Sequence, residues 1–166
     1  MYPGKYAEQN PDRSAFVMAA TGERVSYQEF EARSNRVAHY LADKGLGFQD
    51  HYSIFMENNN RYLESCAAGE RSGLYFTCIN SFLTSDELAY IINNSESQIL
   101  ITSMSKLEAA QEALAQCTAI KEVLVVGAGD ADLPEGMSDF ASTLSKYPET
   151  PLERELLGAA MLYSSC

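Results

Sequence analysis

Four short apolar segments, separated by stretches of helix length, constrain the fold of this chain more than any other feature of its sequence. They span residues 52–56, 74–79, 98–102 and 122–126. Such nearly continuous apolar segments are typical of strands that are buried on both faces of a parallel sheet. Because parallel strands are joined by right-handed crossovers, the sequence predicts a doubly wound, mostly parallel, Rossmann-like α/β sheet. We expect residues 1–166 to form one such α/β unit.

The stretches between these segments carry signals for helix starts and ends. The capping-box spacing Ser/Thr-x-x-Glu occurs at Ser26–Glu29, Thr84–Glu87 and Ser105–Glu108. Gly45 and Gly73 are placed to end helices. The expected helices cover residues 27–44, 61–72, 84–93 and 105–116, with an N-cap for the second among Asn58, Asn59 and Asn60.

The two ends of the chain differ from this regular centre. A short helix is expected over residues 3–10, followed by a hairpin that pairs 14–19 with 24–26. After Gly127 the chain enters an acidic loop, and a further short helix is expected over 140–147. An apolar strand over 159–163 then runs into Ser164, Ser165 and Cys166.

Composition excludes several classes of function. Apolar residues make up 46% of the chain, which excludes a disordered protein. The 12 basic and 23 acidic residues give a net charge of -11, which argues against nucleic acid and anionic membrane surfaces as partners. No apolar run reaches the roughly 20 residues of a membrane span, and the N-terminus lacks the apolar region of a secretory signal.

The cysteines and histidines give no pattern of a metal site. Cys66, Cys78, Cys117 and Cys166 form no Cys-x-x-Cys pair, and the chain has only two histidines, His39 and His51. We therefore expect no bound metal. Reduced thiols in a cytoplasmic protein are the simplest interpretation of these cysteines.

Ligands of open α/β sheets bind at the carboxyl edge of the strands, which here means the loops 57–60, 80–84, 102–105 and 127–130. Gly127-Ala128-Gly129 imitates a dinucleotide fingerprint, but Asp130 and Asp132 follow it and would repel a pyrophosphate, so we expect a plain loop. Neither histidine accompanies a nucleophile-elbow sequence, and the acidic residues fit helix starts and solvent-exposed faces. We therefore expect no catalytic residue within the chain.

The end of the chain is the one segment with the character of a phosphate site. A strand that leads into small residues with free hydroxyl and N–H groups is how phosphate-binding loops begin, although a frayed end has the same composition. Tyr163, Ser164 and Ser165 are the candidate nucleotide phosphate-binding residues, at the start of such a loop.

Several segments, in order, resemble the N-terminal part of the AMP-forming acyl-CoA synthetases, members of the adenylate-forming superfamily. Val25–Phe30 with Arg33–Ala38 resembles the family pattern LTYxEL…RSNRLA. Arg71–Asn80 resembles KAGAVYVPLN, and Leu83–Ile91 resembles LTPEELAYIL. Tyr163-Ser164-Ser165 matches the first residues of the phosphate-binding signature YSSGTTGxPKG. The segment beginning at Arg71 is most similar to synthetases for fatty, steroid-like or other carboxylic acids.

The resemblance implies a two-step ligase in the parent protein. A carboxylic acid, such as a fatty acid, would react with ATP in the presence of Mg²⁺ to give acyl-AMP, and CoA would then accept the acyl group. The chain departs from the family where it stops: Cys166 stands at a glycine position, and the later motifs are absent. Asn80-Ser81-Phe82 replaces the commoner Asn-Pro-Arg, so a CoA contact there cannot be carried over.

These departures lead to expectations for the chain by itself. We expect a truncated N-terminal subdomain that is catalytically inactive, binds no cofactor tightly and self-associates through apolar surface that the rest of the enzyme would cover. The alternative is a stand-alone α/β binding or regulatory module derived from the same family; an unrelated α/β enzyme is a third possibility.

Overall fold

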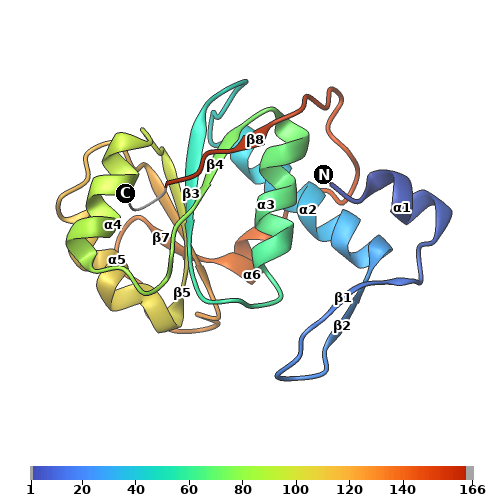
Figure 1. Cartoon of the computed structure of the whole chain (residues 1–166), viewed down its shortest axis with the longest axis horizontal. Coiled ribbons are helices and arrows are strands. Elements are labelled where there is room, and N and C mark those ends of the chain that lie inside the picture. The colour runs from blue at the N-terminus through green and yellow to red at the C-terminus, as the bar shows by residue number, and fades with distance from the viewer. Residues whose placement is uncertain (1, 164–166) are drawn as a thin grey trace.

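The computed structural model describes residues 2–163 as a parallel sheet with helices on both faces and a small N-terminal addition (Figure 1). The strands are β1 (Ser14–Val17), β2 (Arg24–Ser26), β3 (His51–Phe55), β4 (Tyr75–Cys78), β5 (Ile99–Ser103), β6 (Glu122–Val126), β7 (Met137–Asp139) and β8 (Ala159–Ala160). The helices are α1 (Gly4–Gln9), α2 (Tyr27–Asp43), α3 (Tyr62–Ser72), α4 (Ser85–Asn94), α5 (Leu107–Leu114) and α6 (Phe140–Leu144). A short 3-10 turn, Met104–Lys106, leads into α5.

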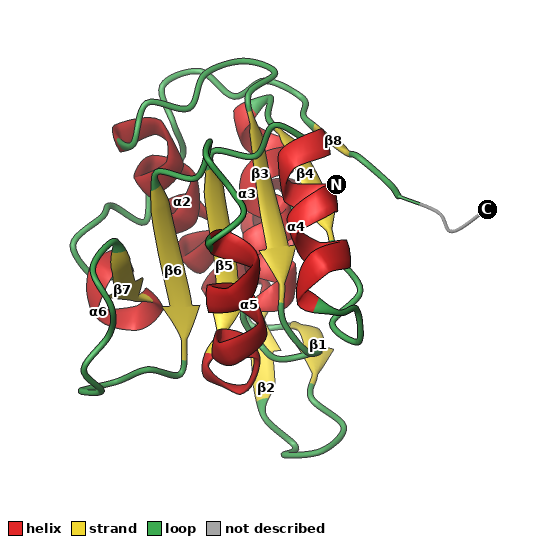
Figure 2. Cartoon of the chain, turned by 90° about the vertical axis from the view of Figure 1, so that its left-hand side faces the viewer, coloured by secondary structure: helices red, strands yellow, loops and turns green. Residues whose placement is uncertain are grey.

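The main sheet has six parallel strands in the order β7-β6-β5-β3-β4-β8. Figure 2 shows that the strands of this sheet run in one direction, so their carboxyl ends meet at one edge. From β3 the chain first moves to β4 on one side and then to β5 on the other. The doubly wound, mostly parallel prediction is therefore confirmed, and the strand order reverses between β3 and β5.

Two apolar layers hold the sheet between the helices. One layer contains Tyr52 and Ile54 of β3 and is covered by α2, α3 and α6. The other contains Phe55 of β3 and Leu100 of β5 and is covered by α4 and α5. Successive strand residues point to opposite layers, which is why these strands are mostly apolar rather than alternating between apolar and polar residues.

Two of the three predicted capping boxes are present. Ser26 and Glu29 cap α2 reciprocally, and Thr84 and Glu87 cap α4 in the same way. The prediction at Ser105 is wrong: a 3-10 turn spans this residue, and α5 begins only at Leu107 without a side-chain cap, while the Ser105 hydroxyl donates to Glu57. The helix α3 also lacks a side-chain N-cap, although Asn59 accepts a hydrogen bond from the Arg61 N–H.

The C-terminal part differs from the sequence predictions in the number and length of its strands. The strand β7, which was not predicted, adds to the far edge of the sheet beside β6. The strand expected over 159–163 is shorter, because only Ala159 and Ala160 pair with β4 in register. The backbone N–H of Met161 still donates to Phe76, so β4 guides the chain beyond β8.

Candidate functional site

A hydrogen-bonded carboxylate, Glu57, lies at the crevice where the strand order reverses. Glu57 follows β3 and accepts hydrogen bonds from the hydroxyls of Ser103 and Ser105, both at 2.5 Å. Burial favours a higher pKa for Glu57, but these hydroxyl hydrogen bonds outweigh it and hold the pKa of the carboxyl below its usual value. A carboxylate at this position repels phosphate, so the usual ligand crevice of the fold is a poor phosphate site here.

A groove of about 290 Å³ lies one strand further along the same edge. It is formed by the end of β4, by α4 and by Tyr163, which follows β8. Its lining residues are Thr77, Cys78, Ile79, Asn80, Leu83, Glu87, Tyr90, Ile91 and Tyr163. The Tyr163 hydroxyl donates to Asn94 Oδ1 at 2.8 Å, which anchors the chain after β8 to the end of α4.

The described lining of this groove is apolar and hydroxylic rather than cationic. It contains the phenol rings of Tyr90 and Tyr163 and, within residues 2–163, no lysine, arginine or histidine. Its carboxylate, Glu87, accepts hydrogen bonds from the backbone and side chain of Thr84, which lower its pKa. The groove is suited to an uncharged part of a ligand, and an anionic part would need donors from outside this lining. Ser164 and Ser165, the predicted phosphate-binding hydroxyls, lie outside the described residues.

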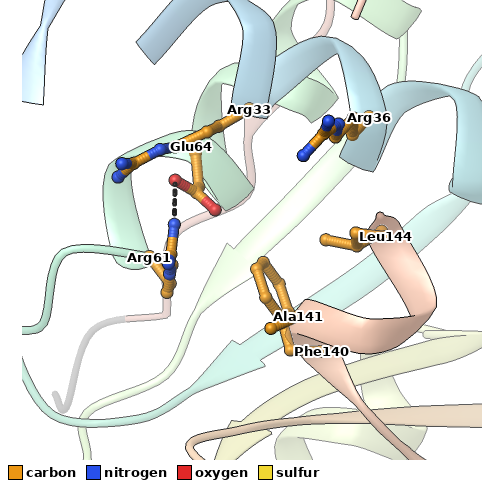
Figure 3. Close-up of a pocket in the computed structure, with 7 residues that line it drawn as sticks. All are labelled: Arg33, Arg36, Arg61, Glu64, Phe140, Ala141 and Leu144. Atoms are coloured by element: carbon orange, nitrogen blue, oxygen red, sulfur yellow. Dashed lines mark hydrogen bonds and ion pairs between the residues drawn. The ribbon is translucent and has the colours of Figure 1, made fainter. Parts of the chain in front are cut away.

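A second cavity, of about 250 Å³, lies between α2, α3 and α6 (Figure 3). Arg33, Arg36, Arg61 and Glu64 meet there with apolar side chains of α6. Each guanidinium group is paired with a carboxylate: Arg33 with Glu29 at 3.6 Å, Arg36 with Glu149 at 2.6 Å and Arg61 with Glu64 at 3.5 Å. The cavity is therefore a compensated charge network, and it lies on the face of the sheet opposite α4 and its groove.

Sequence reasoning did not single out Glu64, because an acidic residue in the first turn of a helix is ordinary. The structure buries its side chain to 3% exposure. This burial raises the pKa of Glu64 to about 7, although Arg61 and Arg33 oppose the rise.

We predict that Glu64→Gln stabilises the chain at pH 8. The pKa of Glu64 in the folded state is about 7, above its ordinary value of 4.5. Between pH 4.5 and pH 7 the folded state therefore keeps a proton on Glu64 that the unfolded state has lost. Stability due to this group is present below pH 4.5 and falls as pH rises towards 7, by about 3 kcal/mol in total. Urea unfolding at pH 5 and pH 8 measures the difference between wild type and variant at each pH. Glu112→Gln, on the exposed face of α5, is the control. Equal pH dependence in the wild type and Glu64→Gln would contradict the prediction.

The other residues considered in the sequence lie apart from the groove. His39 Nε2 is 2.9 Å from the Thr150 carbonyl, and the His51 ring packs edge-on against Tyr75. Gly127 and Gly129 adopt positive φ angles, and the Gly129 N–H donates to Asp139, so this loop leads to β7 and not to a nucleotide-binding helix. Among residues 2–163, no three His, Cys, Asp or Glu side chains are grouped closely enough to hold a metal ion. No described helix is both long and apolar enough to cross a membrane.

Comparison with known proteins matches the chain to the family described as AMP-binding enzyme, over residues 5–165. Among curated proteins, a medium/long-chain-fatty-acid--CoA/3-oxocholest-4-en-26-oate--CoA ligase of Mycolicibacterium smegmatis is 28% identical over 138 residues, which are 82% of this chain and 25% of that protein. A 3-oxocholest-4-en-26-oate--CoA ligase of Rhodococcus rhodochrous is 30% identical over 146 residues, 86% of this chain and 26% of that protein. The chain thus spans about a quarter of the length of these relatives.

Solved structures share the fold. The anthranilate CoA ligase AuaEII, in complex with anthranoyl-AMP, superposes with a TM-score of 0.87 at 15% identity and covers 99% of this chain and 31% of its own. A long-chain-fatty-acid CoA ligase structure from Rhodopseudomonas palustris, described as putative in its name, has a TM-score of 0.80 at 22% identity and covers 95% of this chain and 38% of its own. At these identities the two structures bear on the fold alone.

Proposed function

Because this chain belongs to the AMP-binding enzyme family, we propose that it is the N-terminal part of an AMP-forming acyl-CoA ligase. The observation that supports this proposal most directly is the position of β8 in the sheet. This strand lies parallel beside β4, and Tyr163, which follows it, lines the groove at the carboxyl end of β4. A phosphate-binding loop that begins here would lie next to the groove between β4 and α4.

The proposed reaction has two steps. The carboxylate of the acid attacks the α-phosphorus of ATP, which forms acyl-AMP and releases pyrophosphate. The CoA thiol then attacks the acyl carbonyl, which forms the thioester and releases AMP. The names of the curated relatives favour a fatty or steroid-type acid as substrate.

In this proposal the chain positions the substrate and the start of the phosphate loop, and it contributes no charged group to the reaction. The groove would shield an uncharged part of a substrate from water, and the hydrogen bond between Tyr163 and Asn94 would hold the start of the phosphate loop. Residues 2–163 offer no cluster of ligands for Mg²⁺, so no step is assigned to this ion through them. Three described free cysteines fit a reducing compartment, and we propose a cytoplasmic location.

The test compares the complete gene product with the 166-residue chain. Each is incubated with ATP, Mg²⁺, CoA and a panel of medium- and long-chain fatty acids and steroid acids, and AMP and acyl-CoA are measured by mass spectrometry. We expect acid-dependent acyl-CoA from the complete protein and none above background from the chain. Acyl-AMP formed by the chain would overturn the expected inactivity. No acid-dependent AMP from the complete protein would overturn the ligase proposal.

The state of the isolated chain must be measured in the same experiment. Leu157, Leu162 and Phe82 are each at least 80% exposed, so we propose that the chain self-associates through these side chains. Sedimentation over a range of concentrations measures this association and shows whether the sample assayed stays in solution. The alternative of a stand-alone binding module predicts a monomer that binds ATP without turning it over.

A further inference from the structure

The fold brings two thiols together that lie twelve residues apart in the sequence. Cys66 is on α3 and Cys78 is the last residue of β4, and their Sγ atoms are 3.6 Å apart. Both thiols are free and half-buried, and both pack against the apolar layer between α3 and the sheet. Tyr62, one turn before Cys66 on α3, packs against the same apolar layer.

The two sulfurs differ in their readiness to react. The neighbouring Cys66 thiol and Tyr62 hydroxyl lower the pKa of Cys78 to about 7, against the effect of burial. The hydrogen bond with Cys78 and burial raise the pKa of Cys66. The thiolate is the nucleophilic form of cysteine, so Cys78 is the thiol that reacts first.

Access and distance allow the two residues to be joined. Cys78 is partly exposed and is one of the residues that line the groove between β4 and α4, so we expect a molecule of the size of hydrogen peroxide to reach its sulfur. A disulfide has a sulfur–sulfur distance of about 2.05 Å, so the two sulfurs must approach by about 1.5 Å. Rotation about the Cα–Cβ bonds of the two side chains can supply such a movement.

We propose that Cys66 and Cys78 form an oxidation-sensitive dithiol, a modification site at which a peroxide produces a reversible intramolecular disulfide. The Cys78 thiolate attacks one peroxide oxygen, the O–O bond breaks, and the released hydroxide takes a proton to become water. The Cys66 sulfur then attacks the Cys78 sulfenic acid, the S–O bond breaks, and the departing hydroxyl leaves as water with the Cys66 proton. Two thiols lose two electrons, and one peroxide becomes two waters. This inference does not depend on the proposed ligase function.

The test uses the full chain with Cys166→Ser, so that the last residue contributes no thiol. The protein is treated with a small excess of hydrogen peroxide, quenched with N-ethylmaleimide and digested for mass spectrometry. We expect a peptide pair linked through Cys66 and Cys78, lost again on reduction, that forms at least about tenfold faster than oxidation at Cys117. Cys117 is the internal control, because burial raises the pKa of its thiol and its sulfur lies against backbone carbonyls.

Single variants separate the two roles. With Cys66→Ser, Cys78 should accumulate as a sulfenic acid that dimedone traps, whereas Cys78→Ser should abolish both the link and the rapid reaction. Cys117→Ser should leave the link unchanged. Equal rates of oxidation at Cys78 and Cys117, or no linked peptide from a chain with native circular dichroism, would overturn the proposal.

Discussion

Replacing Arg71 with methionine is expected to destabilise the fold by about 3–5 kcal/mol, because it leaves two carboxylates without their buried cation. The Arg71 side chain is completely buried. It pairs with Glu31 of α2 through two hydrogen bonds of 2.6 and 2.7 Å and with Glu155 at 3.0 Å. It also donates to Ser34 and Asn35. One guanidinium group thus ties α3 to α2 and to the segment before β8.

A matched variant shows whether the loss of stability comes from the burial of the ion pair or from the loss of a positive charge alone. Arg36→Met removes a 2.6 Å ion pair to Glu149, but both of these side chains are at least one-third exposed, and exposed pairs contribute at most about 1 kcal/mol. Urea unfolding at pH 7 measures both variants. Arg71→Lys keeps the charge but loses the planar fork, so we expect an intermediate loss. The interpretation fails if Arg71→Met costs no more than Arg36→Met.

Replacing Gly158 with alanine is expected to release β8 from the sheet. A Cβ at this position would lie 2.1 Å from the Gly69 carbonyl oxygen and 2.4 Å from the Leu74 carbonyl oxygen. Both are backbone atoms of packed elements, and overpacking of this kind costs about 1–3 kcal/mol. We therefore expect the N–H groups of Ala159 and Met161, which donate to Leu74 and Phe76, to exchange with deuterium about 10- to 100-fold faster.

The faster exchange should be confined to β8, so the control is an alanine substitution at a glycine with free space around it. Gly47→Ala meets only Asp50 Oδ2 at 3.7 Å, an ordinary contact, so exchange at β8 should be unchanged. The Gly158 variant should keep the protection of β3 and β5 at the centre of the sheet. In the complete protein, displacement of β8 should also lower acyl-CoA formation, because the start of the proposed phosphate loop moves with it. Unchanged protection at Ala159 would show that β8 does not need this glycine.

Local sequence patterns predicted the elements whose signals lie within a few residues. The capping residues Ser26 and Thr84 are bonded to Glu29 and Glu87 three positions later, and Gly73 ends α3 with a φ of 72°. The apolar strands predicted the doubly wound sheet because burial on both faces favours apolar residues at most strand positions. Such signals involve residues of a single helix or strand, so contacts with the rest of the folded chain do not change them.

The features that were missed depend on residues far apart in the sequence. Ser105 has a capping-box spacing, but its hydroxyl donates a hydrogen bond to Glu57, which lies 48 residues earlier in the sequence. The three residues of β7 are half-buried at the edge of the sheet and have no apolar pattern. Arg71 has the sequence context of an exposed helical residue, and only the packing of α3 on α2 places it beside Glu31.

The candidate site was predicted in part. The carboxyl edge of the sheet and the strand that leads to Tyr163 followed from the pattern. The contact of Glu57 with Ser103 and that of Cys66 with Cys78 depend on how the strands are arranged in the sheet. Tyr163 stays a predicted phosphate-site residue: its hydroxyl is bonded to Asn94 and its ring lines the groove.

The most direct measurement of the central proposal is the nucleotide sequence that follows codon 166 in the gene encoding this chain. If the chain is the N-terminal part of an acyl-CoA ligase, we predict an open reading frame that continues as a loop of the type Thr-Thr-Gly-x-Pro-Lys-Gly, rich in glycine and able to surround a phosphate. A stop codon directly after codon 166 in the native gene would contradict the proposal.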